Sequence, residues 1–234
     1  MLDNAFESDA FRAPLNAALE DTKSSMSAKS TNSGFCALCG HRATKTTMMA
    51  HVETCVAAHD EIGQPQPLVV VRFAAVGAPR YWLIIEANAD AQLGHVDALL
   101  RQLWLECCGH MSAFRVGRRE LAMTTAAAIA FARAASKMDY EYDFGSTTAL
   151  TGELVGKRHG SIGRASVRLL ARNDPLVWPC VDCKNPATVV CPFCLDSDDA
   201  LFCDAHADVH EHVGEEVYLP VVSSPRMGVC GYTG

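Results

Sequence analysis

Residues 68–87 read LVVVRFAAVGAPRYWLIIEA, two runs of β-branched, aliphatic and aromatic side chains separated by Gly77 and Pro79. Runs of this composition favour extended strands, and a glycine and a proline between them favour a turn. The stretch therefore predicts a β-hairpin, with one strand over residues 68–75 and the other over residues 81–87.

Outward from this hairpin, helical and extended patterns follow each other. Val96, Leu99 and Leu103 recur at helical spacing and predict a helix over residues 95–106, and the alanine-rich residues 126–135 favour a second helix. Extended runs predict further strands at residues 112–116, 139–144, 147–155 and 165–171. Helices mixed with antiparallel strands predict an α+β fold for a middle domain over residues 66–173.

The composition indicates a globular protein. The chain has 234 residues, of which 49% are apolar, and no apolar run reaches the roughly 20 residues that a membrane helix needs. The first residues lack the basic and apolar regions of a secretory signal, so we expect a cytoplasmic protein without a membrane partner. The 11 cysteines stand mostly in C-x2-C pairs, which in a reducing compartment indicates metal binding rather than disulfides.

A first metal motif lies in residues 34–60, where the spacing is C-x2-C-x11-H-x3-C. Two cysteines on a tight turn supply half of a tetrahedral site, and a histidine and a cysteine four residues apart share one face of a helix. The expected ligands of this zinc finger are Cys36, Cys39, His51 and Cys55. The residues before it, 1–33, are polar and predict a disordered or loosely ordered tail.

A second, denser cluster lies in residues 176–234. Eight ligand-type residues fall within 33 positions and suffice for two closed tetrahedral sites. They are Cys180, Cys183, Cys191, Cys194, Cys203, His206, His210 and His212. Because no coordination position stays open for a substrate, we expect three structural zinc ions in the chain, counting the finger, and no catalytic metal.

The spacing leaves two pairings open for this double-zinc module. In a sequential arrangement, the four early cysteines would share one ion, and the helical spacing of His206 and His210 favours this alternative. In a cross-brace, the first and third ligand pairs would share one ion and the second and fourth pairs the other. The order of the pairs resembles B-box and RING-like modules, and this resemblance implies the cross-brace.

Residues outside the zinc motifs suggest two further activities. Cys107 or Cys108, with His110 and Asp143, could form an enzymatic site in the middle domain, although buried cysteines also act as small apolar side chains. Cys230 has no assigned role. A basic stretch could bind nucleic acid, as could the finger, or could form a solvated strand face. Its arginines are Arg158, Arg164, Arg168 and Arg172.

Three segments of the middle domain resemble the plasmid ORF-three-like family, also labelled transposon-passenger resolvase-like. They are Trp82 to Ile84, Trp104 to Phe114 and Tyr140 to Ser146. Residues 110–114 match the family's His-Leu-x-x-Phe pattern and residues 142–145 its Tyr-Asp-Phe-Gly pattern. The family's following Trp and His are absent here, where Ser146, Thr147 and Thr148 stand. From residue 35 onward the chain is also similar to uncharacterised prokaryotic proteins with the same three-part order.

These observations favour a non-enzymatic, multi-zinc adaptor that recognises a macromolecule. Residues 173–234 carry a net charge of -8, whereas residues 64–172 carry +4. An acidic module is a poor ligand for phosphate backbones, so a protein partner is expected for the C-terminal part. Nucleic acid stays the alternative partner for the middle domain and the finger, and the enzymatic site stays the alternative function.

Overall fold

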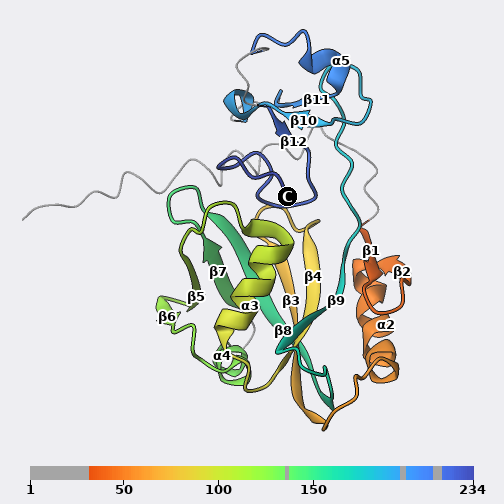
Figure 1. Ribbon diagram of the computed structural model, residues 1–234, viewed down its shortest axis with the longest axis vertical. Coiled ribbons are helices and arrows are strands. Elements are labelled where there is room, and N and C mark those ends of the chain that lie inside the picture. The colour runs from red at the N-terminus through yellow and green to blue at the C-terminus, as the bar shows by residue number, and fades with distance from the viewer. Residues whose placement is uncertain (1–31, 135–136, 196–198, 213–217) are drawn as a thin grey trace, which may run out of the picture.

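The computed structural model describes residues 32–134, 137–195, 199–212 and 218–234. A nine-stranded antiparallel sheet dominates the described chain (Figure 1). Its strands, in spatial order, are β2 (Arg42–Thr44), β1 (Ser33–Cys36), β9 (Val167–Asn173), β4 (Trp82–Asn88), β3 (Gln66–Ala75), β8 (Thr148–Gly160), β7 (Met138–Tyr142), β5 (Ser112–Val116) and β6 (Arg119–Leu121). The hairpin predicted from residues 68–87 forms its centre as β3 and β4.

Both faces of the central hairpin are buried, which explains why its sequence is almost continuously apolar. Val71 and Ile85 point into a large core on one face, while Val70 and Ile84 point into a second core on the other. Successive side chains of a strand alternate between faces, so one hairpin serves two cores. Register shifts at Val70/Val71 and Ile84/Ile85 accommodate the twist of the long strands.

Short helices cover these two faces. The larger core lies beneath α3 (Leu93–Leu100), its π-helical continuation η2 (Arg101–Leu105) and α4 (Ala127–Arg133). The smaller core lies beneath α2 (Lys45–Ala58), which contributes Met48, Val52 and Val56. Thr44 begins α2 because its hydroxyl accepts a hydrogen bond from the amide of Thr47 at 3.3 Å.

The predicted α+β class is wrong, because the described chain is mainly β. The two predicted helices of the middle domain are short, since α3 has eight residues, η2 five and α4 seven. Strands extend further than the pattern indicates: β8 runs through the basic residues 157–159 to Gly160. The segment 34–60 also adds β1 and β2 to the same sheet, since β1 pairs with β9.

The C-terminal module has its own small sheet, at the top of Figure 1. Its strands are β10 (Val189–Val190), β11 (Leu201–Phe202) and β12 (Leu219–Pro220), accompanied by η3 (Pro192–Cys194) and α5 (Asp204–Ala207). The buried core comprises six residues, of which Cys191 and Cys194 are candidate ligands. So small a core supplies little apolar stabilisation to the module.

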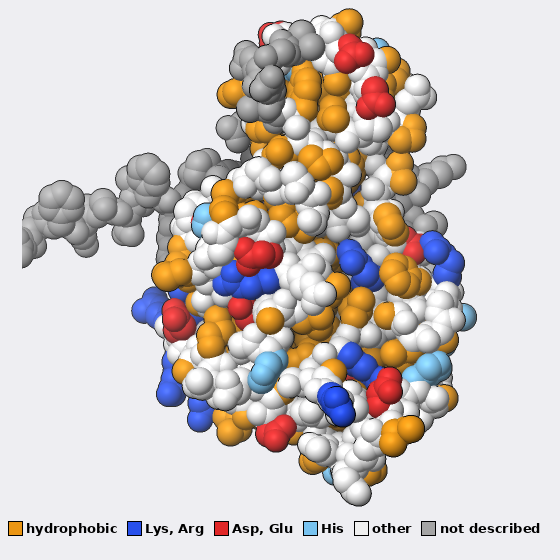
Figure 2. All heavy atoms as spheres, in the orientation of Figure 1, with side chains coloured by type: hydrophobic (Ala, Val, Ile, Leu, Met, Phe, Trp, Pro, Cys, Tyr) orange, Lys and Arg blue, Asp and Glu red, His pale blue; other side chains and the backbone are white. Residues whose placement is uncertain are grey.

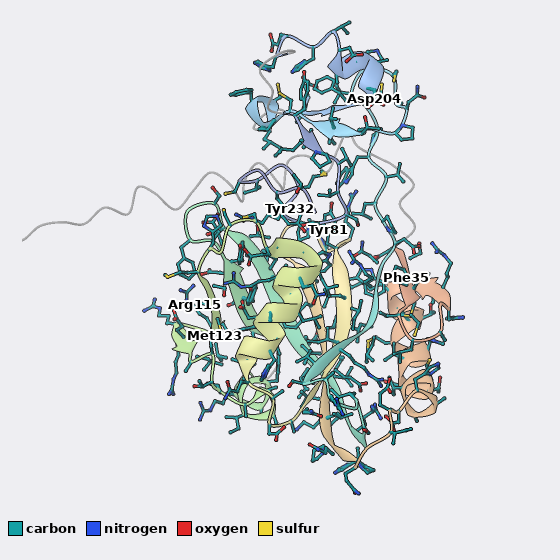
Figure 3. All side chains as sticks on the ribbon, viewed as in Figure 1. Phe35, Tyr81, Arg115, Met123, Asp204 and Tyr232 are labelled. Atoms are coloured by element: carbon teal, nitrogen blue, oxygen red, sulfur yellow. The ribbon has the colours of Figure 1, made fainter. Side chains whose placement is uncertain are left out.

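The last residues of the chain return to the large sheet. We call residues 221–234 the tail; Figure 3 labels its Tyr232, which lies between the module, marked by Asp204, and the sheet. Within the tail, the Ser224 hydroxyl donates a 2.6 Å hydrogen bond to the carbonyl of Trp104. Of the predicted N-terminal tail, residues 1–31 lie outside the described residues, and Ser33 already begins β1. Among the described helices, none combines the length and the apolar character needed to cross a bilayer.

Candidate metal centres

Four groups of cysteine and histidine side chains converge in the described chain, each with four ligand atoms within 4.8 Å of one another. Each group could hold a metal ion. The finger group is Cys36, Cys39, His51 and Cys55. The first module group is Cys180, Cys183, Cys203 and His206. The second module group is Cys191, Cys194, His210 and His212. The tail group is Cys107, Cys108, His110 and Cys230.

Zinc sets a geometric standard for such groups. An ion about 2.3 Å from sulfur and about 2.0 Å from nitrogen, at tetrahedral angles, separates two sulfurs by about 3.8 Å and a sulfur from a nitrogen by about 3.5 Å. Two nitrogens are then about 3.3 Å apart. A group whose ligand atoms show these separations is arranged for one ion, whereas a merely polar cluster has no reason to match all of them.

The finger group combines a turn with a helix. Cys36 ends β1, and Gly40 at φ +76° completes the turn that aims the sulfurs of Cys36 and Cys39 inward. His51 and Cys55 project from α2 on one face. The Cys36 and Cys55 sulfurs are 3.9 Å apart, and His51 Nε2 is 3.3 Å from the Cys39 sulfur.

The protonation of Cys55 couples this group to pH. Burial is the main cause that raises the pKa of Cys55 to about 12, with the Cys39 and Cys36 thiols adding to it. A cation that binds there must displace a proton from this sulfur. Metal affinity at the finger group should therefore fall as the pH falls.

The first module group joins the turn at residues 180–183 to the start of α5, where Cys203 precedes the helix and His206 lies within it. The Cys183 and Cys203 sulfurs are 3.7 Å apart, and His206 Nδ1 lies 3.5 Å from the Cys180 sulfur. Burial favours the neutral thiol of Cys180, but backbone amides at Cys203, Cys183 and Asp182 outweigh it and lower its pKa to about 6. This sulfur is thus ready to act as a thiolate ligand at neutral pH.

The second module group contains two histidines. His210 Nε2 lies 3.4 Å from the Cys194 sulfur, and His212 Nδ1 lies 3.5 Å from the Cys191 sulfur. The two nitrogens are 3.1 Å apart. The Phe202 ring packs on His210 at 4.2 Å between centroids and fixes the imidazole plane. The grouping of the eight module ligands is that of the cross-brace alternative and differs from the sequential one.

The tail group contains most of the residues of the predicted enzymatic site. The structure brings Cys107, Cys108 and His110 together with Cys230, which lies 120 positions beyond His110. Asp143 stands beside the group, with its Oδ2 atom 3.6 Å from His110 Nε2. Sequence reasoning missed this set, because Cys230 has no partner at short spacing. One signal in the sequence could have found it. Three cysteines stay outside the predicted zinc motifs, namely Cys107, Cys108 and Cys230, and together with His110 they are enough for one further four-ligand site.

The arginines of the predicted basic stretch are mostly paired within the chain. Arg158 contacts Asp60 at 2.8 Å and the buried Glu86 at 2.8 Å, and Arg168 contacts Glu86 at 2.5 Å. Arg172 donates to the carbonyl of Ser223 at 3.3 Å. Of the four arginines, Arg164 is the exposed one.

Comparison with known proteins adds little to this picture. No protein-family model matches the chain, and no curated protein is similar enough in sequence to count as a relative. A crystal structure of a protein of unknown function, MM3350 from Methanosarcina mazei Go1, shares 13% sequence identity at a TM-score of 0.40. The likeness covers 47% of this chain and 70% of that one. It assigns no function, and the resemblance to the plasmid ORF-three-like family stays a prediction.

Proposed function

We propose that the protein is a non-enzymatic binding protein, organised by structural zinc, whose C-terminal module recognises a protein partner with basic and apolar side chains. The observation that carries the proposal is the exposure of apolar side chains on this small module. Phe193 is 57% exposed and Val209 76% exposed. Large exposed apolar side chains on so small a body favour an interaction site.

The charge around these side chains supports a basic partner. A shallow pocket of about 470 Å³ lies beside Val209 and is lined in part by Asp182, Asp199 and Glu211. Figure 2 shows acidic and hydrophobic side chains together on the upper module, with lysine and arginine on the body below. Carboxylates around an apolar centre select a partner of opposite charge and speed its association.

The role of zinc in this proposal is structural. All cysteines and histidines between residues 180 and 212 belong to the two module groups, so each ion would have four protein ligands and no position for a substrate. We further propose three such ions in the finger group and the two module groups. The B-box-like character of residues 176–234 and the ORF-three-like character of residues 66–173 belong to the same proposal.

Nucleic acid is the weaker alternative partner. Phosphate binding needs free lysine and arginine side chains. Arg158 and Arg168 are paired with Glu86, and of the four predicted arginines only Arg164 is exposed. The enzymatic alternative is also weaker, since its cysteines and histidine stand at metal-ligand separations from Cys230.

Selection from a displayed peptide library on the full-length zinc-loaded protein tests this function. We expect enriched sequences to combine lysine or arginine with a large apolar residue. The variant Phe193→Ser/Val209→Ser should raise the Kd of a selected peptide by roughly tenfold or more. We expect these two apolar side chains to supply much of the binding energy, as a few central residues do in most interfaces.

The matched control is Val177→Ser, which makes the same kind of change at a side chain that is 68% exposed but lies outside residues 180–212, which carry the two module groups. It should leave both peptide affinity and zinc content unchanged. Absence of enrichment, or peptide binding that survives the double substitution, would contradict the proposal. Tight, steeply salt-dependent binding of mixed-sequence DNA or RNA by the same sample would instead establish the nucleic-acid alternative.

A further inference from the structure

We propose that the tail group is a fourth zinc site, and that its ion fastens the tail to the large sheet. Its four ligands come from two distant parts of the chain. Cys107, Cys108 and His110 lie in the loop between η2 and β5, whereas Cys230 lies near the end of the tail. A metal here would close a cross-link that no other covalent or coordinate bond between these segments supplies within the described residues.

The separations of the ligand atoms fit one ion. The Cys108 sulfur is 3.6 Å from the Cys107 sulfur and 3.5 Å from the Cys230 sulfur. His110 Nε2 lies 3.0 Å from the Cys108 sulfur and 3.2 Å from the Cys230 sulfur. These values agree within about half an ångström with the edges of a zinc tetrahedron. Three sulfurs and one imidazole are a ligand set typical of structural zinc.

The backbone is shaped for these ligands. Gly109, directly after Cys108, has φ +74°, and the corresponding residues after the second cysteine of the finger and first module groups, Gly40 and Lys184, have φ +76° and +64°. Cys230 itself has φ +52°. A cysteine rarely adopts this left-handed conformation unless the surrounding structure demands it, and such demands concentrate at functional sites.

The charges around the group also fit a metal-thiolate centre. Three thiolates and one Zn²⁺ carry a net charge of -1, which needs a compensating cation when partly buried. Arg226 is fully buried and directs its Nε toward the Cys107 sulfur at 3.3 Å. Its Nη2 donates to Asp143 at 2.6 Å, and its Nη1 donates to the carbonyl of Ser146 at 3.0 Å. Arg226 is therefore a positioning residue: it orients the Cys107 sulfur, and its charge is shared between that sulfur and Asp143.

The same tail holds the C-terminal module. Met227 packs against the small core of the module, and a Cβ atom at Gly228 would meet the side chain of Leu195 at 2.9 Å. One residue before Met227, Arg226 donates to the hydroxyl of Thr148, in β8 of the large sheet, at 3.1 Å. An ion at Cys230 would thus fix the module in place relative to the sheet, through a segment that contacts both.

A disulfide between Cys108 and Cys230 is the competing interpretation, because their two sulfurs are close enough to form a bond after a small movement. Oxidation would remove two hydrogens and lower the mass of the chain by about 2 Da, with an oxidant such as O₂ taking the electrons. Metal binding instead releases protons from the thiols and leaves the chain mass unchanged after the ion is removed. Intact mass under denaturing conditions therefore separates the two readings.

Zinc analysis of the full-length protein, purified without chelator, tests the site directly. We expect four zinc ions per chain, one for each group. Cys230→Ser should contain one ion fewer, and Thr233→Ala, a change at an exposed neighbour in the tail, should keep all four. The His110→Ala variant should also contain one ion fewer. Agreement between the two variants would show that the loss does not come from misfolding peculiar to Cys230→Ser.

Three results would overturn the proposal: wild-type protein with three zinc ions, equal zinc content in wild type and Cys230→Ser, or a wild-type mass about 2 Da low. This outcome is independent of the proposed function, which is measured by peptide binding at Phe193 and Val209. A protein can fail one test and pass the other.

Trypsin tests whether the ion also fastens the tail. The bond after Arg226 is protected in the folded chain because Arg226 is fully buried. Intact-mass measurements over time give the rate at which trypsin removes residues 227–234. We expect this rate to be roughly tenfold higher in Cys230→Ser than in Thr233→Ala. Equal rates in the two variants would show that the ion, where present, does not hold the tail.

Discussion

At the residue scale, Glu86 shows how the basic stretch is used inside the molecule. Its carboxylate is fully buried in β4 and is bound by Arg158 and Arg168. Arg168 also donates to the carbonyl of His59, the residue that ends α2, at 2.8 Å. One acidic side chain thus joins the end of the finger helix to two strands of the sheet.

We expect Glu86→Gln to destabilise the protein by about 3 kcal/mol, because it leaves two guanidinium groups without their shared counter-charge. The control Glu153→Gln breaks the half-exposed Arg72–Glu153 pair and should cost less than about 1 kcal/mol. Urea unfolding in zinc-containing buffer, monitored by far-ultraviolet circular dichroism, measures both values. Equal free energies of unfolding for the two variants would show that Glu86 has no special structural role.

The candidate ligands illustrate what residue spacing can and cannot predict. Pairs such as Cys36 and Cys39, or His51 and Cys55, lie on one turn or one helix face, so their convergence follows from local geometry. Cys230 reaches Cys108 only through the path of the whole chain, and no local pattern encodes that path. The buried Arg226, which accompanies it, gives no sequence signal at all.

At the element scale, β1 joins the finger to the sheet. It pairs with β2 on one side and β9 on the other. Gly34 lies at the centre of this contact, and a Cβ atom there would overlap the carbonyl oxygen of Arg172 and meet the Trp82 ring at 2.6 Å. Only glycine permits this close approach of β1 to its neighbours.

Gly34→Ala should therefore destabilise the docking of β1 by about 1–3 kcal/mol, through displacement of the strand or of Trp82. Gly156→Ala in β8 is the matched control, since its Cβ would only touch Val70 Cβ at an ordinary 3.6 Å. Hydrogen exchange at the β1 amides, followed by mass spectrometry, measures the local effect. Unchanged protection of β1 in Gly34→Ala would contradict the expected overlap.

The same scale shows how far secondary structure follows from the sequence. The β3–β4 hairpin and strand β5 were predicted within two residues of their observed ends, because composition and turn residues agree there. The α+β class was wrong because the helices of the middle domain are short and the strands extend further than the pattern indicates. The continuation of β8 into Lys157 and Arg158 was also missed, since polar residues there indicate a loop unless their buried partner Glu86 is known.

At the scale of the whole molecule, the two sheets differ in what stabilises them. The larger core of the large sheet, beneath α3, η2 and α4, contains 24 buried residues, whereas the module's core contains six. A core of the first kind folds on its own apolar burial, while one of the second kind depends on added cross-links. We therefore expect the larger core to fold without metal and the module to depend on metal.

Removal of zinc should unfold the module and leave the larger core folded. With a strong chelator, we expect amides of residues 180–212 to lose hydrogen-exchange protection while those of β3, β4 and β8 keep it. Restored zinc should restore the protection. Simultaneous loss of protection in both parts, or a module that stays protected without metal, would contradict this division of stability.

The two edge strands of the large sheet affect how copies of the protein associate. The outermost strands, β2 and β6, have three residues each, and Arg42, Arg119 and Glu120 place charges on them. Short, charged edge strands offer little unpaired backbone with which a strand of a neighbouring chain could pair. Concentrated solutions should therefore stay free of the sheet-to-sheet fibres that long, flat, uncharged borders invite.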